Sequence, residues 1–233
     1  MFTRSAHLYD TLHASKDYAD EASRLRRFVA AHSTGTAATP LEVACGTGRY
    51  LELLRADFAV AGLDLDPAML SLARQRLGDV PLYQGDMVDF AVERQFDVVV
   101  CLFGSIAYVR TTERLQQALA SMIRHTRTGG LIMVEPWLGP EQALDGHLSA
   151  RFVDQPDYKI ARRRVSRVAG SMSLLEFHYL VATPGGVEHF SEHHELGIFS
   201  LAAYQTAFAS VGLSAWHDPW GLSGWGLYGA TRD

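Results

Sequence analysis

The chain has 233 residues, of which 48% are hydrophobic and 20% charged, and its net charge at pH 7 is −5. This length suits one domain with a full hydrophobic core, and the composition is typical of a soluble globular protein. The negative net charge argues against a nucleic acid as the main partner. No apolar segment follows Met1 and no apolar run reaches about 18 residues, so we expect neither a signal peptide nor a membrane-spanning helix. The two cysteines, Cys45 and Cys101, lie in apolar segments, which favours a reducing, cytoplasmic location.

Residues 8–31 are predicted to be mostly helical. Asp17 is a good N-cap, and apolar residues follow it at a spacing of three to four positions. Tyr9 and Tyr18 belong to two short motifs, Leu8-Tyr9-Asp10 and Lys16-Asp17-Tyr18. These motifs offer aromatic rings and hydrogen-bonding groups, which serve either a ligand or only the packing of a leading helix.

Residues 41–50 form an apolar run that turns on Gly46 and Gly48 and continues into good helix formers. This order is typical of a strand, a tight turn and a helix in a βαβ unit. Glycines leave no side chain between the backbone and a ligand, so the turn predicts a nucleotide site at the end of a first parallel strand. A dinucleotide fingerprint would have a third glycine where this chain has Leu51, which disfavours a pyrophosphate ligand.

Three acidic residues mark three successive predicted strands. Glu42 lies inside the first strand, and Asp64 and Asp86 follow the next two apolar runs. Asp64 is placed to accept hydrogen bonds from both hydroxyls of a ribose, and Asp86 from an adenine amino group. The three acids therefore favour a cationic adenosine derivative over the plainer alternative of three ordinary strand ends.

The alternation of strand and helix continues to residue 136. Four further elements are predicted, namely a helix beginning at Asp66 and Pro67, a central strand at 96–103, a helix from Thr111 or Thr112 to Gly129-Gly130, and a fifth strand at 131–136. This order predicts a doubly wound, Rossmann-like α/β fold with a parallel sheet.

The pattern changes at residues 144–199, where runs with a period of two replace the alternation. We expect an antiparallel β insert in this range, placed over the carboxyl edge of the sheet, within a single domain of residues 1–233. Turns are predicted at residues 169–171 and 184–186. A helix beginning at Ser200, followed by strands at 213–216 and 226–230, would complete a seven-stranded sheet.

The segment 188–195 contains three histidines and three glutamates, which raises the question of a metal site. On a helix, His189 and His193 would lie one turn apart and could share an ion. On a strand they are ~13 Å apart along one face, too far for a common ion. Since the segment has a strand pattern, we expect a solvated face and no metal.

The motifs Glu42 to Gly48, Gly62-Leu63-Asp64 and Gln84-Gly85-Asp86-Met87 together resemble the cofactor site of class I S-adenosylmethionine-dependent methyltransferases. The resemblance implies S-adenosylmethionine as cofactor and a seven-stranded Rossmann-like sheet. It also implies cofactor contacts from Tyr9, Tyr18, Ala44, Gly46, Gly48, Asp64, Leu65, Met69, Asp86, Met87 and Leu102.

Over nearly its whole length the chain is similar to the bacterial enzymes that N,N-dimethylate amino sugars carried on thymidine diphosphate. Segments that carry the similarity include Phe103 to Tyr108, Glu135-Pro136-Trp137, Glu176 to Ala182 and Ser223 to Tyr228. The similarity implies N-methylation of a nucleotide-linked amino sugar in antibiotic biosynthesis, with Tyr108 aiming the amine. It also implies acceptor contacts from Glu135, Trp137, Arg164, Ser166 and Trp225.

One departure bears on the acceptor, because the family's Ser-Gly-Arg-Gly pattern has an arginine where this chain has Trp225. Tryptophan cannot pair with a phosphate through two hydrogen bonds as arginine does, so a methyltransferase for another small metabolite, with an oxygen or carbon acceptor, stays open. A non-catalytic nucleotide-binding module is disfavoured by the large insert. Methylation of DNA or RNA is disfavoured because Leu102-Phe103-Gly104-Ser105 replaces the acid or asparagine and two prolines expected there. The sequence leaves a homodimer open.

Overall fold

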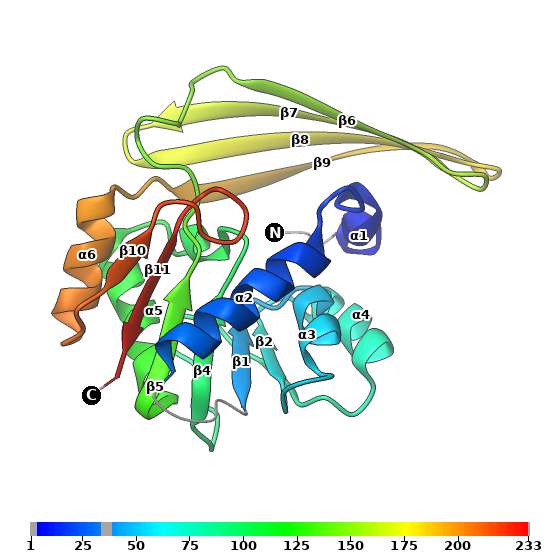
Figure 1. Cartoon of the computed structure of the whole chain (residues 1–233). Coiled ribbons are helices and arrows are strands. Elements are labelled where there is room, and N and C mark those ends of the chain that lie inside the picture. The colour runs from blue at the N-terminus through cyan, green and yellow to red at the C-terminus, as the bar shows by residue number, and fades with distance from the viewer. Residues whose placement is uncertain (1–3, 34–38, 233) are drawn as a thin grey trace.

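Two β-sheets organise the protein in the computed structural model, which describes residues 4–33 and 39–232. The larger sheet has seven strands in the order β10-β11-β5-β4-β1-β2-β3, and the smaller has four in the order β6-β7-β8-β9. Figure 1 shows the smaller sheet lying across one end of the larger, with the N-terminal segment between them. The expected α/β fold with an antiparallel insert after the fifth strand is confirmed.

Five strands of the larger sheet run parallel, and a C-terminal hairpin closes one edge. The parallel strands are β1 (Pro40–Val43), β2 (Ala61–Asp64), β3 (Leu82–Gln84), β4 (Phe96–Cys101) and β5 (Thr126–Val134). The hairpin consists of β10 (Trp216–Asp218) and β11 (Leu227–Thr231), and β11 pairs antiparallel with both β10 and β5. The expected seven strands are therefore present, with one of them antiparallel.

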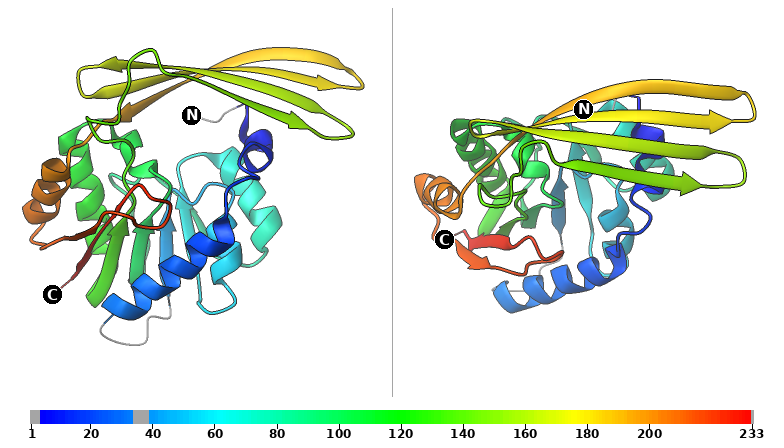
Figure 2. Two further views of the ribbon diagram at one scale, coloured as in Figure 1. Left: turned by 45° about the horizontal axis from the view of Figure 1, so that its top comes forward. Right: turned by 90° about the horizontal axis from the view of Figure 1, so that it is seen from above.

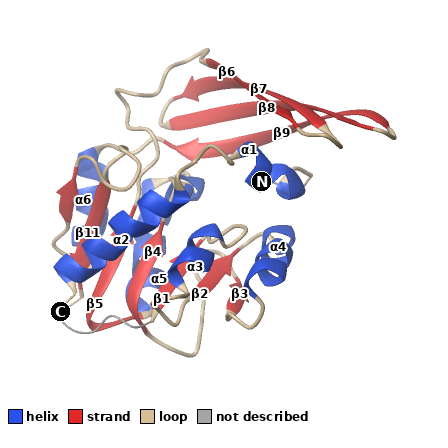
Figure 3. Ribbon diagram, turned by 45° about the vertical axis from the view of Figure 1, so that its right-hand side comes forward, coloured by secondary structure: helices blue, strands red, loops and turns tan. Residues whose placement is uncertain are grey.

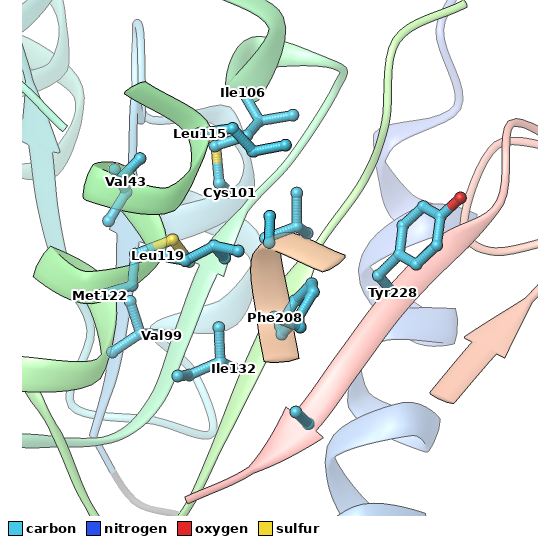
Figure 4. Close-up of a cluster of buried hydrophobic side chains, with 14 of the residues drawn as sticks. Val43, Val99, Cys101, Ile106, Leu115, Leu119, Met122, Ile132, Phe208 and Tyr228 are labelled. Carbon is cyan, nitrogen blue, oxygen red and sulfur yellow. The ribbon is translucent and has the colours of Figure 1, made fainter. Parts of the chain in front are cut away.

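Helices cover both faces of this sheet, which makes it doubly wound. One face packs against α2 (Tyr18–His32), α3 (Arg49–Leu54) and α4 (Pro67–Leu77), and the other against α5 (Thr112–Arg124) and α6 (Leu201–Ser210). In Figure 4, Leu115, Leu119 and Met122 of α5 face Val99 and Ile132 of the sheet. There are also three short helical segments, η1 (Ala6–Leu8), α1 (Tyr9–Leu12) and η2 (Ser105–Val109), and Figure 3 shows α1 between the insert and the larger sheet.

The predicted helix starts are confirmed by side-chain caps. Asp17 accepts a hydrogen bond from the Asp20 N–H, and Asp66 from the Ala68 N–H, both at 2.9 Å. Thr111 and Ser200 cap α5 and α6 in the same way. Each such cap satisfies an otherwise unpaired donor and contributes about 1 kcal/mol.

The prediction that Gly129-Gly130 ends a helix is wrong. Helix α5 already ends at Arg124, and β5 runs through both glycines. The register of β5 against β4 shifts in this part of the strand, as at a β-bulge. A Cβ on Gly130 would lie 2.8 Å from the Arg127 carbonyl oxygen and 2.9 Å from the Asp97 carbonyl oxygen, so the close approach of backbone segments requires glycine there.

The insert is a four-stranded antiparallel sheet, shown from two sides in Figure 2. Its strands are β6 (Leu148–Asp154), β7 (Lys159–Ala169), β8 (Met172–Thr183) and β9 (Gly186–Gly197). The turns predicted at 169–171 and 184–186 are confirmed. Its inner face packs on Leu8 and Leu12 of the N-terminal segment, which therefore joins the insert to the rest of the molecule.

Candidate functional site

A cleft of about 380 Å³ lies between the carboxyl ends of the parallel strands and the last strand of the insert. This is the edge at which open α/β sheets bind ligands. Nine residues predicted to contact cofactor or acceptor line it, namely Tyr9, Ala44, Gly46, Asp64, Leu65, Met69, Asp86, Met87 and Tyr108. The cleft therefore brings together most of the predicted cofactor residues.

The two glycines of the turn after β1, Gly46 and Gly48, have different structural roles. Both have positive φ, which glycine adopts without strain. A Cβ on Gly46 would meet nothing within 4 Å, so this glycine opens space in the cleft. A Cβ on Gly48 would lie 2.6 Å from Cδ1 of Leu77, so Gly48 allows α3 to approach α4 closely. Gly48 does not line the cleft, and its contact with a cofactor stays a prediction.

Asp64 is held at the end of β2 by backbone donors. Its Oδ2 accepts from the Gly46 N–H at 2.7 Å and its Oδ1 from the Asp66 N–H at 2.9 Å. Burial raises the pKa of Asp64, while these hydrogen bonds lower it and favour the carboxylate. Each oxygen keeps a further lone pair, so the carboxylate can also accept two hydroxyl donors from the cleft.

Asp86 lines the cleft with its orientation fixed by two partners. Its Oδ1 accepts from the Val88 N–H at 3.1 Å, and its Oδ2 pairs with Arg114 Nη2 of α5 at 3.1 Å. Arg114 also lines the cleft but was not predicted, because nothing in the sequence near α5 connects it with the end of β3.

On the opposite wall, Tyr108 meets a histidine of the insert. The Tyr108 hydroxyl lies 2.6 Å from Nδ1 of His194, and His194 Nε2 lies 3.8 Å from Oε2 of Glu192. Both β9 residues are buried, whereas His189 and His193 alternate with them on the exposed face. The prediction that segment 188–195 is a solvated face is therefore wrong for one face of the strand. The described part of the chain contains no group of three side chains placed to hold a metal ion.

Several predicted site residues do not line the cleft, namely Tyr18, Gly48, Leu102, Glu135, Trp137, Arg164, Ser166 and Trp225. Tyr18 packs edge-on against Tyr50 with ring centroids 5.1 Å apart, and Leu102 is buried after β4. Glu135 is also buried, and it accepts hydrogen bonds from the Phe103 N–H at 2.6 Å and the Ser223 hydroxyl at 2.5 Å. Glu135 thus joins the loop after β4 to the loop before β11, and its contact with an acceptor stays a prediction.

Trp137 and Trp225 form an aromatic pair, with ring centroids 4.9 Å apart at an angle of 39°. Trp225 is 42% exposed, so the pair presents part of its surface to solvent. A contact of either ring with an acceptor stays a prediction.

The inner face of the insert carries three arginines in neighbouring positions. Arg151 of β6 pairs in register with Arg162 of β7, and Arg164 follows two residues later on the same face. Within residues 4–33 and 39–232, no carboxylate lies within ion-pair distance of any of the three. Burial, and then repulsion by the neighbouring arginines, lowers the pKa of Arg164. Ser166, another predicted acceptor contact, lies two residues further along this face and is buried.

No helix in the described part of the chain is long and apolar enough to span a membrane.

A methyltransferase domain family matches residues 41–130. The chain is 43% identical over 96% of its length, and 95% of the relative's, to a dTDP-3-amino-3,4,6-trideoxy-alpha-D-glucopyranose N,N-dimethyltransferase of Streptomyces venezuelae. It is 35% identical, over 98% of its length and 92% of the relative's, to a dTDP-4-amino-2,3,4,6-tetradeoxy-D-glucose N,N-dimethyltransferase of Saccharopolyspora spinosa.

Two solved structures share the fold over almost the entire chain. The structure of DesVI from Streptomyces venezuelae superimposes with a TM-score of 0.90 at 41% identity and 98% coverage of both chains. The amino pentose methyltransferase CalS10 of Micromonospora echinaspora, solved with bound S-adenosylmethionine, gives 0.87 at 35% identity and 97% coverage of both chains. The chain therefore belongs to the family of S-adenosylmethionine-dependent methyltransferases that contains the dTDP-amino-sugar N,N-dimethyltransferases.

Proposed function

We propose that this protein transfers methyl groups from S-adenosylmethionine, its cofactor, to the amino nitrogen of a nucleotide-linked amino sugar in antibiotic biosynthesis. The observation that carries the proposal is the opposite charge of the two sides of the site. Asp64 and Asp86 line the cleft on its sheet side, and a half-buried arginine cluster without carboxylate partners among the described residues lies outside the cleft lining, on the inner face of the insert. The named activities of the relatives point to the same reaction.

The cofactor fits the sheet side of the cleft. When bound, it supplies an electrophilic methyl group on a sulfonium ion, which is a good leaving group. The space at Gly46 and the lone pairs of Asp64 suit an adenosine ribose, and Asp86 suits an adenine amino group. Negative side chains at this edge also suit the positive charge of a sulfonium.

The chain's own contribution to the reaction is to place a neutral amine. A nitrogen must present its lone pair in line with the bond that breaks, and such positioning supplies a large share of the acceleration. Tyr108 lines the cleft at the edge where the sheet and the insert meet, so its oxygen is placed to take a hydrogen bond from the amine. That hydrogen bond would aim the lone pair.

The diphosphate of the acceptor is assigned to the arginine cluster of Arg151, Arg162 and Arg164. Three guanidinium groups on one face repel one another, and an anion with several oxygens relieves this repulsion through paired hydrogen bonds. The Nε of Arg164 is buried without a hydrogen-bond partner in the described structure, which fits an absent ligand. The cluster would supply the positive charge that Trp225 does not.

The proposal is tested by an activity screen read by mass spectrometry. Purified protein receives S-adenosylmethionine and either amino sugars linked to thymidine diphosphate or the same amino sugars without the nucleotide. We expect one or two methyl groups to be added to a linked sugar and much slower methylation of the free sugar. Equal rates on both would favour the alternative of a nucleotide-free metabolite and make the arginine cluster irrelevant to binding.

A homodimer, a cytoplasmic location and the absence of a nucleic-acid partner stay predictions. For the homodimer, support comes from the outer face of the insert, where Phe152, Ala161 and Leu180 lie in one row across three strands. Phe152 is 67% exposed and Leu180 is 48% exposed, so the row is an apolar surface that a second copy could cover. Light scattering of the purified protein decides between monomer and dimer.

A further inference from the structure

Tyr108 is the first member of a chain of polar groups that leads from the cleft into the insert. Its hydroxyl lies 2.6 Å from Nδ1 of His194, which belongs to β9 and is only 2% exposed. The other ring nitrogen of His194 faces Oε2 of Glu192 at 3.8 Å. Tyr108 and His194 both line the cleft, so this row of polar groups begins where an acceptor would lie.

Glu192 is held as a carboxylate by its donors. It accepts from the Ser5 hydroxyl at 2.6 Å, the Ser5 N–H at 3.0 Å and the Arg4 N–H at 2.9 Å. Burial raises the pKa of Glu192, but the nearby His194 ring and the hydrogen bonds from Ser5 and Arg4 outweigh it and bring the pKa to about 2. An ionised carboxylate only accepts hydrogen bonds. Glu192 is therefore an acceptor at neutral pH.

This charge state determines the tautomer of His194. Burial lowers the pKa of His194, and Glu192 opposes that shift only in part, so the ring is neutral at pH 7. The proton of a neutral imidazole lies on the nitrogen that faces an acceptor, which is Nε2 beside Glu192. Nδ1 then carries a lone pair and takes the hydrogen bond from Tyr108. The Tyr108 oxygen is left with lone pairs toward the cleft and no proton to donate there.

We propose that Tyr108 and His194 together remove the proton of the acceptor amine, with Glu192 orienting His194 and stabilising its charged form. The inference rests on the proposed function. An N–H bond of the ammonium breaks and its proton binds the Tyr108 oxygen, while the Tyr108 O–H bond breaks and its proton binds His194 Nδ1. A neutral amine, a neutral tyrosine and an imidazolium facing Glu192 result. His194 returns the proton to solvent through the cleft after the product leaves.

Double methylation makes this removal necessary between the two transfers. Each transfer leaves a protonated amine, which has no lone pair and cannot attack a second methyl group. The intermediate must lose a proton before it reacts again. When a second S-adenosylmethionine has replaced the spent, neutral cofactor, its sulfonium lies beside the ammonium and lowers the pKa of the ammonium, which eases the transfer.

Other titratable groups surround Tyr108, His194 and Glu192 and contribute to the pH dependence of the proton transfer. Burial raises the pKa of Tyr108, and Tyr179 on β8, Glu192 on β9 and Asp64 at the end of β2 raise it further. Tyr108 in turn raises the pKa of Tyr9 on α1. His194 also feels its exposed neighbour His193. Burial holds Tyr108 and Tyr179 in their neutral forms, so His194 is the member of the chain that can take up a proton.

The test replaces His194 with glutamine, whose carbonyl can still accept the hydrogen bond from Tyr108 but cannot accept a proton. We expect the His194→Gln variant to lose about 100-fold in turnover at pH 7, in the range of general acid–base catalysis. The loss should shrink as the pH rises past the pKa of the substrate amine, because the amine then arrives without its proton. The matched control is His189→Gln, on the exposed face of the same strand, which should leave turnover unchanged.

A loss of the same size at every pH would overturn the proposal, since a merely structural role does not depend on the amine's charge. A second measurement needs no substrate. The ¹⁵N shifts of the His194 ring, assigned by comparison with His194→Gln, should show the proton on Nε2 at pH 7. A proton on Nδ1 would mean that His194 donates to Tyr108, which also overturns the proposal. If the wild-type protein methylates no amine at all, the proposed function fails, and the ring tautomer still decides this inference.

Discussion

The two sides of the cleft are built in different ways. On the sheet side, Gly46 and Asp64 are held by a tight turn and by backbone N–H groups within a few residues of the strand ends. On the insert side, His194 and, beyond the cleft lining, Arg164 owe their positions to cross-strand register, and Tyr108 of η2 meets His194 only through a contact between distant segments. We propose that the sheet side binds the cofactor and that the insert side binds the acceptor. Substitutions on the two sides should therefore separate cofactor binding from acceptor chemistry.

The largest expected effect is on the stability of the contact between the insert and the N-terminal segment. Hydrogen bonds to Glu192 lower its pKa from 4.5 to about 2, so Glu192→Gln should reduce the free energy of unfolding at pH 7 by an amount on the order of 3 kcal/mol. Because the folded-state pKa is lowered, this contribution is complete above pH 4.5 and disappears as the pH falls toward 2. Urea unfolding at several pH values measures the difference between the variant and the wild type. A difference that does not shrink at low pH would assign the loss to packing.

The next effect separates the sheet side from the insert side. Asp64→Ala should weaken S-adenosylmethionine binding by ~1.5–3 kcal/mol, since it removes a charged acceptor of hydrogen bonds. Calorimetry on the folded variant measures the change in affinity. The control is Asp89→Ala, because the Asp89 side chain is exposed to solvent. Unchanged affinity in Asp64→Ala would mean that the ribose binds elsewhere.

Tyr108→Phe tests the point where the two sides meet. We expect turnover to fall by ~10–100-fold while the dissociation constant of the cofactor stays the same, because the variant keeps the ring and loses the hydroxyl. The double variant Tyr108→Phe, His194→Gln should have a turnover only slightly lower than either single variant, since both substitutions interrupt the same hydrogen-bonded row. Steady-state kinetics of the two single variants and the double variant provide the measurement. Additive losses would show that Tyr108 and His194 act separately.

The smallest effect concerns the arginine cluster. Arg164→Ala should raise the KM for a nucleotide-linked acceptor by about tenfold, the loss of one charge-assisted hydrogen bond, and leave cofactor binding unchanged. Arg163→Ala is the matched control because its side chain lies on the exposed face of the same strand. Equal KM values for both variants would remove Arg164 from the acceptor site.

Sequence reasoning succeeded where structure is determined locally. The order of strand and helix predicted the sheet, and the caps at Asp17 and Asp66 depend only on residues within three positions. The glycines and acids at the strand ends predicted the cleft because the carboxyl ends of parallel strands meet at one edge. Local patterns failed at Gly129-Gly130, since glycine both ends helices and allows bulges in strands.

The insert side could not be predicted in the same way. No separate strand was predicted at β6, although its residues alternate in burial, because its outer face carries apolar residues as well as polar ones. Tyr108 and His194 are 86 residues apart, and only the register of β9 brings them together. A period of two along residues 188–195 was the available signal, since it places Glu192 and His194 on one face and His193 on the other.

The N-terminal segment has a consequence for protein engineering. Ser5 and Arg4 donate hydrogen bonds to Glu192, Arg151 donates to the Leu12 carbonyl, and Thr11 pairs with Tyr158 at 3.0 Å. Residues 4–13 and 148–197 are thus one structural unit formed from two separate parts of the sequence. A chimaera that takes only the insert from a relative would combine partners that did not evolve together. Exchanging both segments at once preserves these pairings, and is the design by which acceptor preference should be transferred.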